Sequence, residues 1–278
     1  MKSPSHALTP GPVQRMLRWS VLAYALLLVA VPLAGLAHFG LAEGFAAFRG
    51  CLDDPVAQGA LRLTLWTSLL VGALNILFGT ATAWVLVRYR IPGRALLAAL
   101  VDLPFAVPTL VAGIMLVLLF GPESLIGRSA QVFGLEIAFA QPGIILALLF
   151  VTLPFVIRAV EPLLLQISPE EEEAAVILGA GPWRVFMTVF FPVIAPASIS
   201  GGVRSVGRAL GEFGSIVVIA GNIPLKTLTA PVYIFGEIES GAPRTAAAVS
   251  LVLLAFALTL HGVARLIEGH TGARHGQT

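Results

Sequence analysis

Long apolar stretches alternate with short polar segments along the chain. A transmembrane helix needs roughly 20 consecutive, mostly apolar residues. Six segments approach or exceed this length: 17–37, 61–87, 95–120, 142–160, 193–221 and 245–266. The longest polar interruption, residues 161–192, separates the fourth segment from the fifth. This pattern predicts an all-α, multi-pass membrane protein with about six transmembrane helices.

The composition agrees with a chain that lies mostly in lipid. Of its 278 residues, 57% are hydrophobic and 12% are charged, whereas a soluble domain carries about 25% charged residues. The net charge of +2 gives no sign of a nucleic-acid partner. Cys51 is the only cysteine, which excludes an internal disulfide and a cysteine-based metal site. No catalytic constellation is present, so we expect no enzymatic activity in this chain.

The basic residues predict the orientation, because cytoplasmic loops are enriched in Lys and Arg. Placing the N-terminus inside puts ten of these residues on the cytoplasmic side: Lys2, Arg15, Arg18, Arg88, Arg90, Arg94, Arg158, Arg184, Arg265 and Arg274. The opposite side keeps five, namely Arg49, Arg62, Arg128, Lys226 and Arg244. Both termini are therefore predicted to be cytoplasmic. Residues 1–16 would form a loose tail, 17–266 the transmembrane domain and 267–278 a second tail.

The cytoplasmic loop, residues 161–192, contains the signals of two short helices. Ser168 can cap the first helix, Pro169 suits its first position, and Glu171 completes a capping box. Gly179 can end that helix in a left-handed conformation.

A second short helix is predicted from Pro182 to a stop at Pro192. Trp183, Phe186 and Phe190 would form an aromatic face on it. That face either packs beneath the protein's own helices or inserts into a groove on a partner.

The loop resembles the EAA loop of ABC-importer permeases. The resemblance rests on Glu173-Ala174-Ala175, Gly179 three residues later, and Val-Phe-Phe-Pro at 189–192 after nine more. Val189 and Phe191 replace the usual Ile and Leu. The resemblance implies a type I importer permease fold and a coupling helix that docks on a separate ATPase dimer. The coupling residues would be Glu173, Ala174, Ala175, Gly179, Trp183, Phe186 and Pro192. ATP would bind to the partner, and this chain would bind no cofactor or metal.

Asp102 lies within the third apolar segment, close to Pro104 and Pro108. Two prolines four residues apart predict a kinked or locally open helix. Ionisable residues in spans usually face a bundle interior or a wet cavity. The break could therefore form a gate or pathway wall, or it could be a structural kink with Asp102 near the cytoplasmic interface.

Arg204, Arg208 and Glu212 recur every four residues in the fifth segment. Arg208 and Glu212 can pair on one helix face. The pair either holds the span in register or belongs to a pathway in which Arg204 or Arg208 attracts an anion. Gly207 and Gly211 on the same segment would allow a close helix approach.

The stretches 208–215 (RALGEFGS) and 221–227 (GNIPLKT) resemble the sulfate/thiosulfate permeases, and 102–105 and 153–155 fit the same family. The likeness is strongest to the T-type (CysT) subunits. It implies a transport subunit in the bacterial inner membrane, with a second, W-type permease subunit and a periplasmic sulfate-binding protein as partners. A molybdate or tungstate importer permease is the alternative, and a secondary anion transporter is the rival class.

Overall fold

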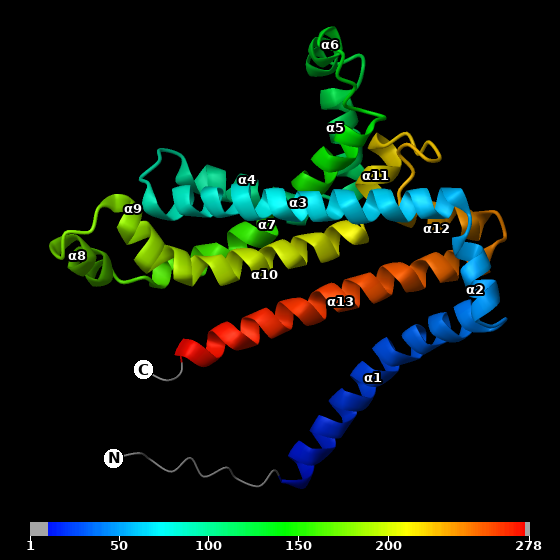
Figure 1. Cartoon of the computed structure of the whole chain (residues 1–278), viewed down its shortest axis with the longest axis horizontal. Coiled ribbons are helices and arrows are strands. Elements are labelled where there is room, and N and C mark those ends of the chain that lie inside the picture. Colours follow the sequence, from blue (N-terminus) through cyan, green and yellow to red (C-terminus); the bar gives the residue numbers. More distant parts are fainter. Residues whose placement is uncertain (1–10, 276–278) are drawn as a thin grey trace.

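The computed structural model describes residues 11–275, which are helical throughout their regular segments and contain no strand. Three long helices form the centre: α3 (Pro55–Arg88), α7 (Gln141–Gln166) and α10 (Phe191–Leu210). They lie side by side in Figure 1 and pack closely against one another. The prediction of an all-α chain with long apolar helices is confirmed.

Small residues bring the three central helices together. A Cβ at Gly201 of α10 would lie 2.8 Å from the Val156 Cα of α7, so the two backbones are in direct contact there. Polar side chains join the same helices. Asn75 of α3 donates to the Thr152 hydroxyl of α7 at 2.7 Å, and the Ser205 hydroxyl of α10 donates to the Thr152 carbonyl at 3.2 Å. Close packing and these hydrogen bonds define one rigid core.

Of the other long helices, α13 (Pro243–His275) packs against α10 of this core, and α1 (Pro12–Leu41) packs against α13. Both run from the end of the molecule that carries α2 (Phe45–Leu52) toward the opposite end (Figure 1). α1 begins within the segment predicted as a tail, and α13 continues into residues 267–275 of the other predicted tail. Residues 1–10 and 276–278 of those tails lie outside the described part.

The third apolar segment is not one helix. It forms α4 (Arg94–Ala106) and α5 (Thr109–Phe120), which meet at an angle of 117°. Val107 is extended and Pro108 follows it, because a residue before proline is disfavoured in the α-helical region. The predicted break within the segment 95–120 is confirmed, and it divides the segment into two half-helices.

The broken pair explains the count of spans. Within residues 11–275, five helices are long and apolar enough to cross a membrane, and the bent pair makes six if it counts as one span. α5 turns away from the core, and α6 (Leu125–Val132) lies beyond it (Figure 1). The short α11 (Gly214–Ile219) holds α5 by close contact, since a Cβ at Gly113 would lie 2.7 Å from the Ser215 carbonyl oxygen.

The fifth apolar segment starts earlier and ends earlier than predicted. One continuous helical run extends from α9 (Pro182–Val185) through a π-helical turn, η1 (Phe186–Phe190), into α10. Pro192 therefore does not stop the helix. The wider π turn before it leaves the proline, which lacks an N–H donor, near the start of α10. At the other end the helix stops at Leu210, so residues 211–213 form a turn before α11.

At the end that carries α2, α3 is anchored by its N-cap. The Asp54 carboxylate accepts from the Val56 and Ala57 backbone N–H groups, and it accepts from the Tyr233 hydroxyl at 2.9 Å. Tyr233 lies on α12 (Ala230–Glu239). The cap therefore joins the start of a core helix to a neighbouring short helix.

Candidate functional site

The cytoplasmic-loop prediction corresponds to α8 (Pro169–Ile177), which follows directly after α7. Ser168 is its N-cap, and its hydroxyl accepts from the Glu170 N–H at 3.2 Å. The Ser168 hydroxyl also donates to the Glu170 carboxylate, which lowers the pKa of that carboxyl. Ser168 therefore caps the helix as predicted, but its hydroxyl pairs with Glu170 rather than with Glu171.

Gly179 terminates α8 as predicted. Its φ of +83° lies in the left-handed region that favours glycine. The Gly179 N–H donates to the Val176 carbonyl at 2.9 Å, and the Ala180 N–H donates to the Ala175 carbonyl at 3.0 Å. These two bonds form a Schellman motif, which fixes the direction in which the chain leaves α8.

The outer surface of α8 is apolar at its end. Ile177 and Leu178 are 85% and 87% exposed, and Val176 is also exposed. Glu173 and Ala174 lie on the exposed side, whereas Ala175 packs against the core cluster around Phe190. Exposed apolar residues grouped on one short helix are typical of a docking surface.

The predicted aromatic face is divided between two environments. Trp183 is 71% exposed and stacks on Phe186 with ring centroids 5.7 Å apart. Phe186 and the buried Phe190 instead pack edge-on against Trp84 of α3, at 5.3 and 4.8 Å. Phe190 thus packs beneath the protein's own helices, whereas Trp183 stays exposed, and its insertion into a partner stays a prediction. Pro192 is exposed at the start of α10.

Arg88, at the end of α3, joins α8 to the core. Its guanidinium forms an ion pair with Glu172 and lies over the Phe190 ring, 4.8 Å from the centroid. A cavity of about 310 Å³ lies beneath α8, between Trp84, Glu172 and Val185. α8 is thus held by its polar side and leaves its apolar end open.

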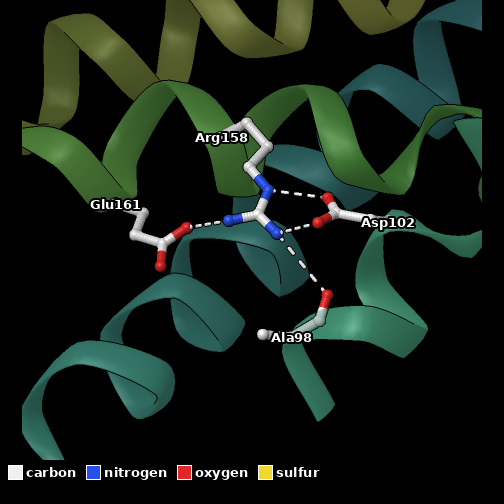
Figure 2. A network of polar contacts seen from close by, with 4 residues as sticks. All are labelled: Ala98, Asp102, Arg158 and Glu161. Carbon is white, nitrogen blue, oxygen red and sulfur yellow. Dashed lines mark hydrogen bonds and ion pairs between the residues drawn. The ribbon is translucent and has the colours of Figure 1, made fainter. Parts of the chain in front are cut away.

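A second polar group lies where α4 meets α7. Arg158 of α7 donates from Nε to Asp102 Oδ1 at 2.7 Å, and its Nη2 pairs with Asp102 Oδ2. Its Nη1 donates to Glu161 Oε2 at 2.5 Å, and its Nη2 also reaches the Ala98 carbonyl at 3.5 Å. Figure 2 shows the guanidinium enclosed by these three residues. Asp102 therefore lies in a cross-helix ion pair, one turn before the α4–α5 break.

The two prolines near this pair have different surroundings. Pro104 is buried inside α4, and Pro108 is exposed at the break, immediately before α5. Asp102 and the break lie on the same helix, so a movement of α4 would displace both.

Arg208 and Glu212 form the predicted pair, with Nη2 and Oε2 2.7 Å apart. Glu212 is 1% exposed and lies in the turn after α10 rather than inside a helix. Its Oε1 also accepts from the Ser215 N–H and hydroxyl, at 2.9 and 2.8 Å. The carboxylate thereby joins α10 to α11. Arg204 lies on an exposed side of α10.

Gly207 and Gly211 do not mediate a close helix contact within the described chain. A Cβ at either position would meet no atom within 4 Å. Both line a cavity of about 490 Å³ between α10, α12 and α13. The close approaches of α10 occur instead at Gly201 and Gly202. Across residues 11–275, no group of three His, Cys, Asp or Glu side chains is arranged to hold a metal ion.

Comparison with known proteins decides the family. Residues 75–271 match the model of the binding-protein-dependent transport system inner membrane component. The probable sulfate transport system permease protein cysT of Chlorokybus atmophyticus is 40% identical over 239 residues, covering 86% of this chain and 84% of that protein. The sulfate transport system permease protein CysW of a Synechocystis strain is 37% identical, covering 90% and 91%. This chain belongs to the binding-protein-dependent transport permeases.

The fold of the permease agrees with this family. A solved bacterial alginate ABC transporter, in complex with an alginate pentasaccharide-bound periplasmic protein, has a chain that superposes with a TM-score of 0.76. The identity is 18%, and the match covers 96% of each chain. The permease is thus a multi-pass membrane protein with an ABC-importer fold, and it is a transport component rather than an enzyme.

Several residues of the site were not identified from the sequence of the permease. Arg158 and Arg88 were used only as orientation markers, and Glu161 and Glu172 were not assigned partners. Arg158 and Glu161 stand three residues apart next to an apolar stretch, which is a signal for a local pair. The contacts of Arg158 on α4 depend on the folding of the chain, and no spacing in the sequence indicates them.

Proposed function

We propose that this permease is the transmembrane subunit of an ATP-driven sulfate/thiosulfate importer in the bacterial inner membrane. The observation that carries the proposal is the identity of 37–40% with curated sulfate permeases over most of both chains. The likeness extends to both the cysT and CysW names, which supports an importer with two related permease subunits. In this assembly the chain would form half of the translocation pathway and act as the T-type subunit.

The ATPase dimer would dock on α8. The exposed apolar end of this helix, together with Trp183, provides the docking surface, and the glycine-dependent turn at Gly179 sets its orientation. Arg88 and Glu172 connect α8 to the transmembrane helices. ATP would be bound and hydrolysed by the partner, with no cofactor on the permease itself. A periplasmic sulfate-binding protein would deliver the anion on the opposite side.

The pathway is proposed to pass the α4–α5 break. Ala106 and Pro108 are exposed at the break in the single chain. Irregular backbone at membrane depth is tolerated only where it is buried in protein or lines a water-filled cavity. The break would therefore face the second permease subunit and the pathway rather than lipid. Arg208 is paired with Glu212, and this pairing would weaken its attraction for a permeating dianion. A weak site suits transport, because tight binding would trap the anion.

Transport would follow alternating access. Closure of the ATPase dimer would move α8, and the helices joined to it would reorient the break between the two sides of the membrane. A nucleotide-driven change of this kind requires that the ATPase and the binding protein favour different states of the permease.

The test is uptake of labelled sulfate into proteoliposomes that contain the permease, its ATPase, the second permease and the binding protein. Gly179→Val is the informative variant, because a β-branched residue at a φ of +83° is strongly disfavoured. Gly181→Val is the matched control. Gly181 has a φ of −69°, and a Cβ at either glycine has open space around it.

We expect ATP-dependent sulfate uptake that Gly179→Val abolishes and Gly181→Val largely preserves, with the complex assembled in both. Uptake without ATP would refute the importer and favour a secondary anion transporter. Equal uptake by the two variants would refute the role of the α8 turn. Preferential uptake of labelled molybdate would retain the architecture and replace the substrate.

A further inference from the structure

We infer that Arg158 is a positioning residue that makes the α4–α5 break move together with the coupling helix α8. This inference rests on the proposed function, because it assigns a role within the transport cycle. It concerns residues that the sequence pattern did not connect: Asp102 on α4, and Arg158 and Glu161 on α7.

The geometry of the contact is directional. Two nitrogens of one guanidinium face the two oxygens of one carboxylate, and such bidentate pairs fix orientation as well as distance. Glu161 holds a third guanidinium nitrogen from the α7 side, and the Ala98 carbonyl faces the group from the preceding turn of α4 (Figure 2). Arg158 therefore contacts two successive turns of α4.

The remaining contacts between α4 and α7 are apolar. Val101 belongs to the same core cluster as Val156 and Val160, and the rings of Phe105 and Phe155 meet edge-on at 5.4 Å. Apolar packing is non-directional, so it resists separation of the helices more than it resists sliding along them. The ion pair is the contact that fixes the position of α4 along α7.

α7 connects this contact to α8 through a linker of only two residues, Ile167 and Ser168. It ends at Gln166, eight residues after Arg158, and α8 begins at Pro169. At a rise of 1.5 Å per residue, the guanidinium is attached about 12 Å from the end of α7. On the other side, Asp102 lies only four residues before Ala106, where α4 ends at the break. A displacement of α8 would thus reach the break through α7, Arg158 and Asp102.

The group holds one positive and two negative side chains, so removing the arginine and removing the aspartate have different effects on it. One guanidinium serves two carboxylates, and all three side chains remain partly exposed, Arg158 at 35% and Asp102 at 47%. Arg158→Gln leaves two facing carboxylates that repel across the helix contact. Asp102→Asn leaves the pair within α7 intact and removes the ion pair to α4, so that on α4 only the 3.5 Å contact with the Ala98 carbonyl is unaffected. Both variants break the connection, whereas exchanging the two charged residues restores it with the same total charge.

The experiment measures ATP hydrolysed per sulfate taken up, in proteoliposomes that contain the assembled importer. Asp102→Asn and Arg158→Gln are compared with the double variant Asp102→Arg/Arg158→Asp. Glu123→Gln is the control, because it removes a carboxylate from the exposed Arg128–Glu123 pair, which lies away from α4 and α7. A residue that only stabilises the fold would lower the amount of assembled importer without changing this ratio.

We expect the ratio to rise about fivefold or more in each single variant, the lower end of typical coupling between sites. The double variant should return to within about twofold of the original ratio, and Glu123→Gln should not change it. If a single variant fails to assemble, Arg158→Lys carries the test, because it keeps the charge and loses the bidentate geometry.

An unchanged ratio in the assembled single variants, or in Arg158→Lys where they do not assemble, would overturn this inference and leave the proposed function intact. A double variant as uncoupled as the single ones would also overturn it. If the unmodified importer takes up no sulfate with ATP, the proposed function fails and this inference fails with it.

Discussion

Gly201 provides a direct test of the packing between the two most central helices. A methyl group at this position would lie 2.8 Å from the Val156 Cα and 3.1 Å from the Phe155 carbonyl oxygen. Both atoms belong to the α7 backbone, which cannot rotate away as a side chain can. Normal contact between carbon atoms begins at about 3.5 Å, so Gly201→Ala would push α10 and α7 apart by roughly 0.7 Å.

The expected cost follows from two opposing effects. Overpacking a close-packed interior costs about 1–3 kcal/mol, while replacing glycine by alanine in a helix returns up to about 1 kcal/mol. Gly207→Ala supplies the second effect alone, since it lies on the same helix and its Cβ would meet nothing within 4 Å. The difference in unfolding free energy between the two variants should therefore be about 1–3 kcal/mol.

The measurement is unfolding of the purified permease in mixed micelles, followed by circular dichroism as denaturing detergent is added. Both variants replace glycine by alanine on the same helix, so the effect of helix propensity cancels in the comparison. This holds also for any helix that persists in the unfolded state. The Ser205–Thr152 hydrogen bond should lengthen in Gly201→Ala alone, because it crosses the widened contact between α10 and α7. Equal stability of the two variants would refute the backbone contact between α7 and α10.

Two further predictions concern the ends of the molecule. Trp183→Ala should weaken binding of the ATPase in a pull-down from detergent and leave the unfolding free energy nearly unchanged. Phe186→Ala should instead destabilise the permease by about 3 kcal/mol, because it removes packing against Trp84. A larger loss of stability in Trp183→Ala than in Phe186→Ala would contradict these assignments. At the far end, burial opposes ionisation of Asp54, but hydrogen bonds from the Val56 N–H, the Tyr233 hydroxyl and the Ala57 N–H outweigh it and lower the pKa of that carboxyl. A lowered folded-state pKa adds stability above the unfolded value and loses it as the pH falls through the folded value. Tyr233→Phe should therefore cost roughly 1 kcal/mol at pH 7, and that cost should shrink below the ordinary value of 3.8; a cost independent of pH would exclude the ionised carboxylate as the acceptor.

The sequence predicted what depends on composition and on local spacing. Apolar length located the long helices, Gly179 predicted a left-handed turn, and the prolines around 104–108 predicted a break. The size of the bend, 117°, did not follow, because α5 also packs against α11 at Gly113, a contact between segments far apart in the sequence. Pro192 was wrongly predicted to end a helix, since the π turn at Phe186–Phe190 allows the helix to continue.

Contacts between distant segments were the part that local spacing could not supply. Phe190 follows Phe186 by four residues, and the pattern treated both as one face with Trp183. In the structure Phe186 and Phe190 pack edge-on against Trp84, about 100 residues earlier in the chain, while Trp183 stays exposed beside Phe186. The same limit applies to Asp102 and Arg158, because 56 residues separate the carboxylate from the guanidinium.

The two arginine ties near α8 share a property that bears on what they do. Arg88 with Glu172, and Arg158 with Asp102, each remain about one-third exposed or more. Exposed ion pairs contribute at most about 1 kcal/mol to stability, because solvent screens them. Neither pair is therefore needed to keep the helices together, which the apolar clusters achieve. These pairs instead fix the relative position of the helices. A pair with defined geometry transmits the displacement of one helix to the next, whereas apolar contacts would allow the helices to slide. Asp102→Asn should consequently alter the coupling ratio severalfold while changing the unfolding free energy by less than about 1 kcal/mol, a combination that a purely structural ion pair would not produce.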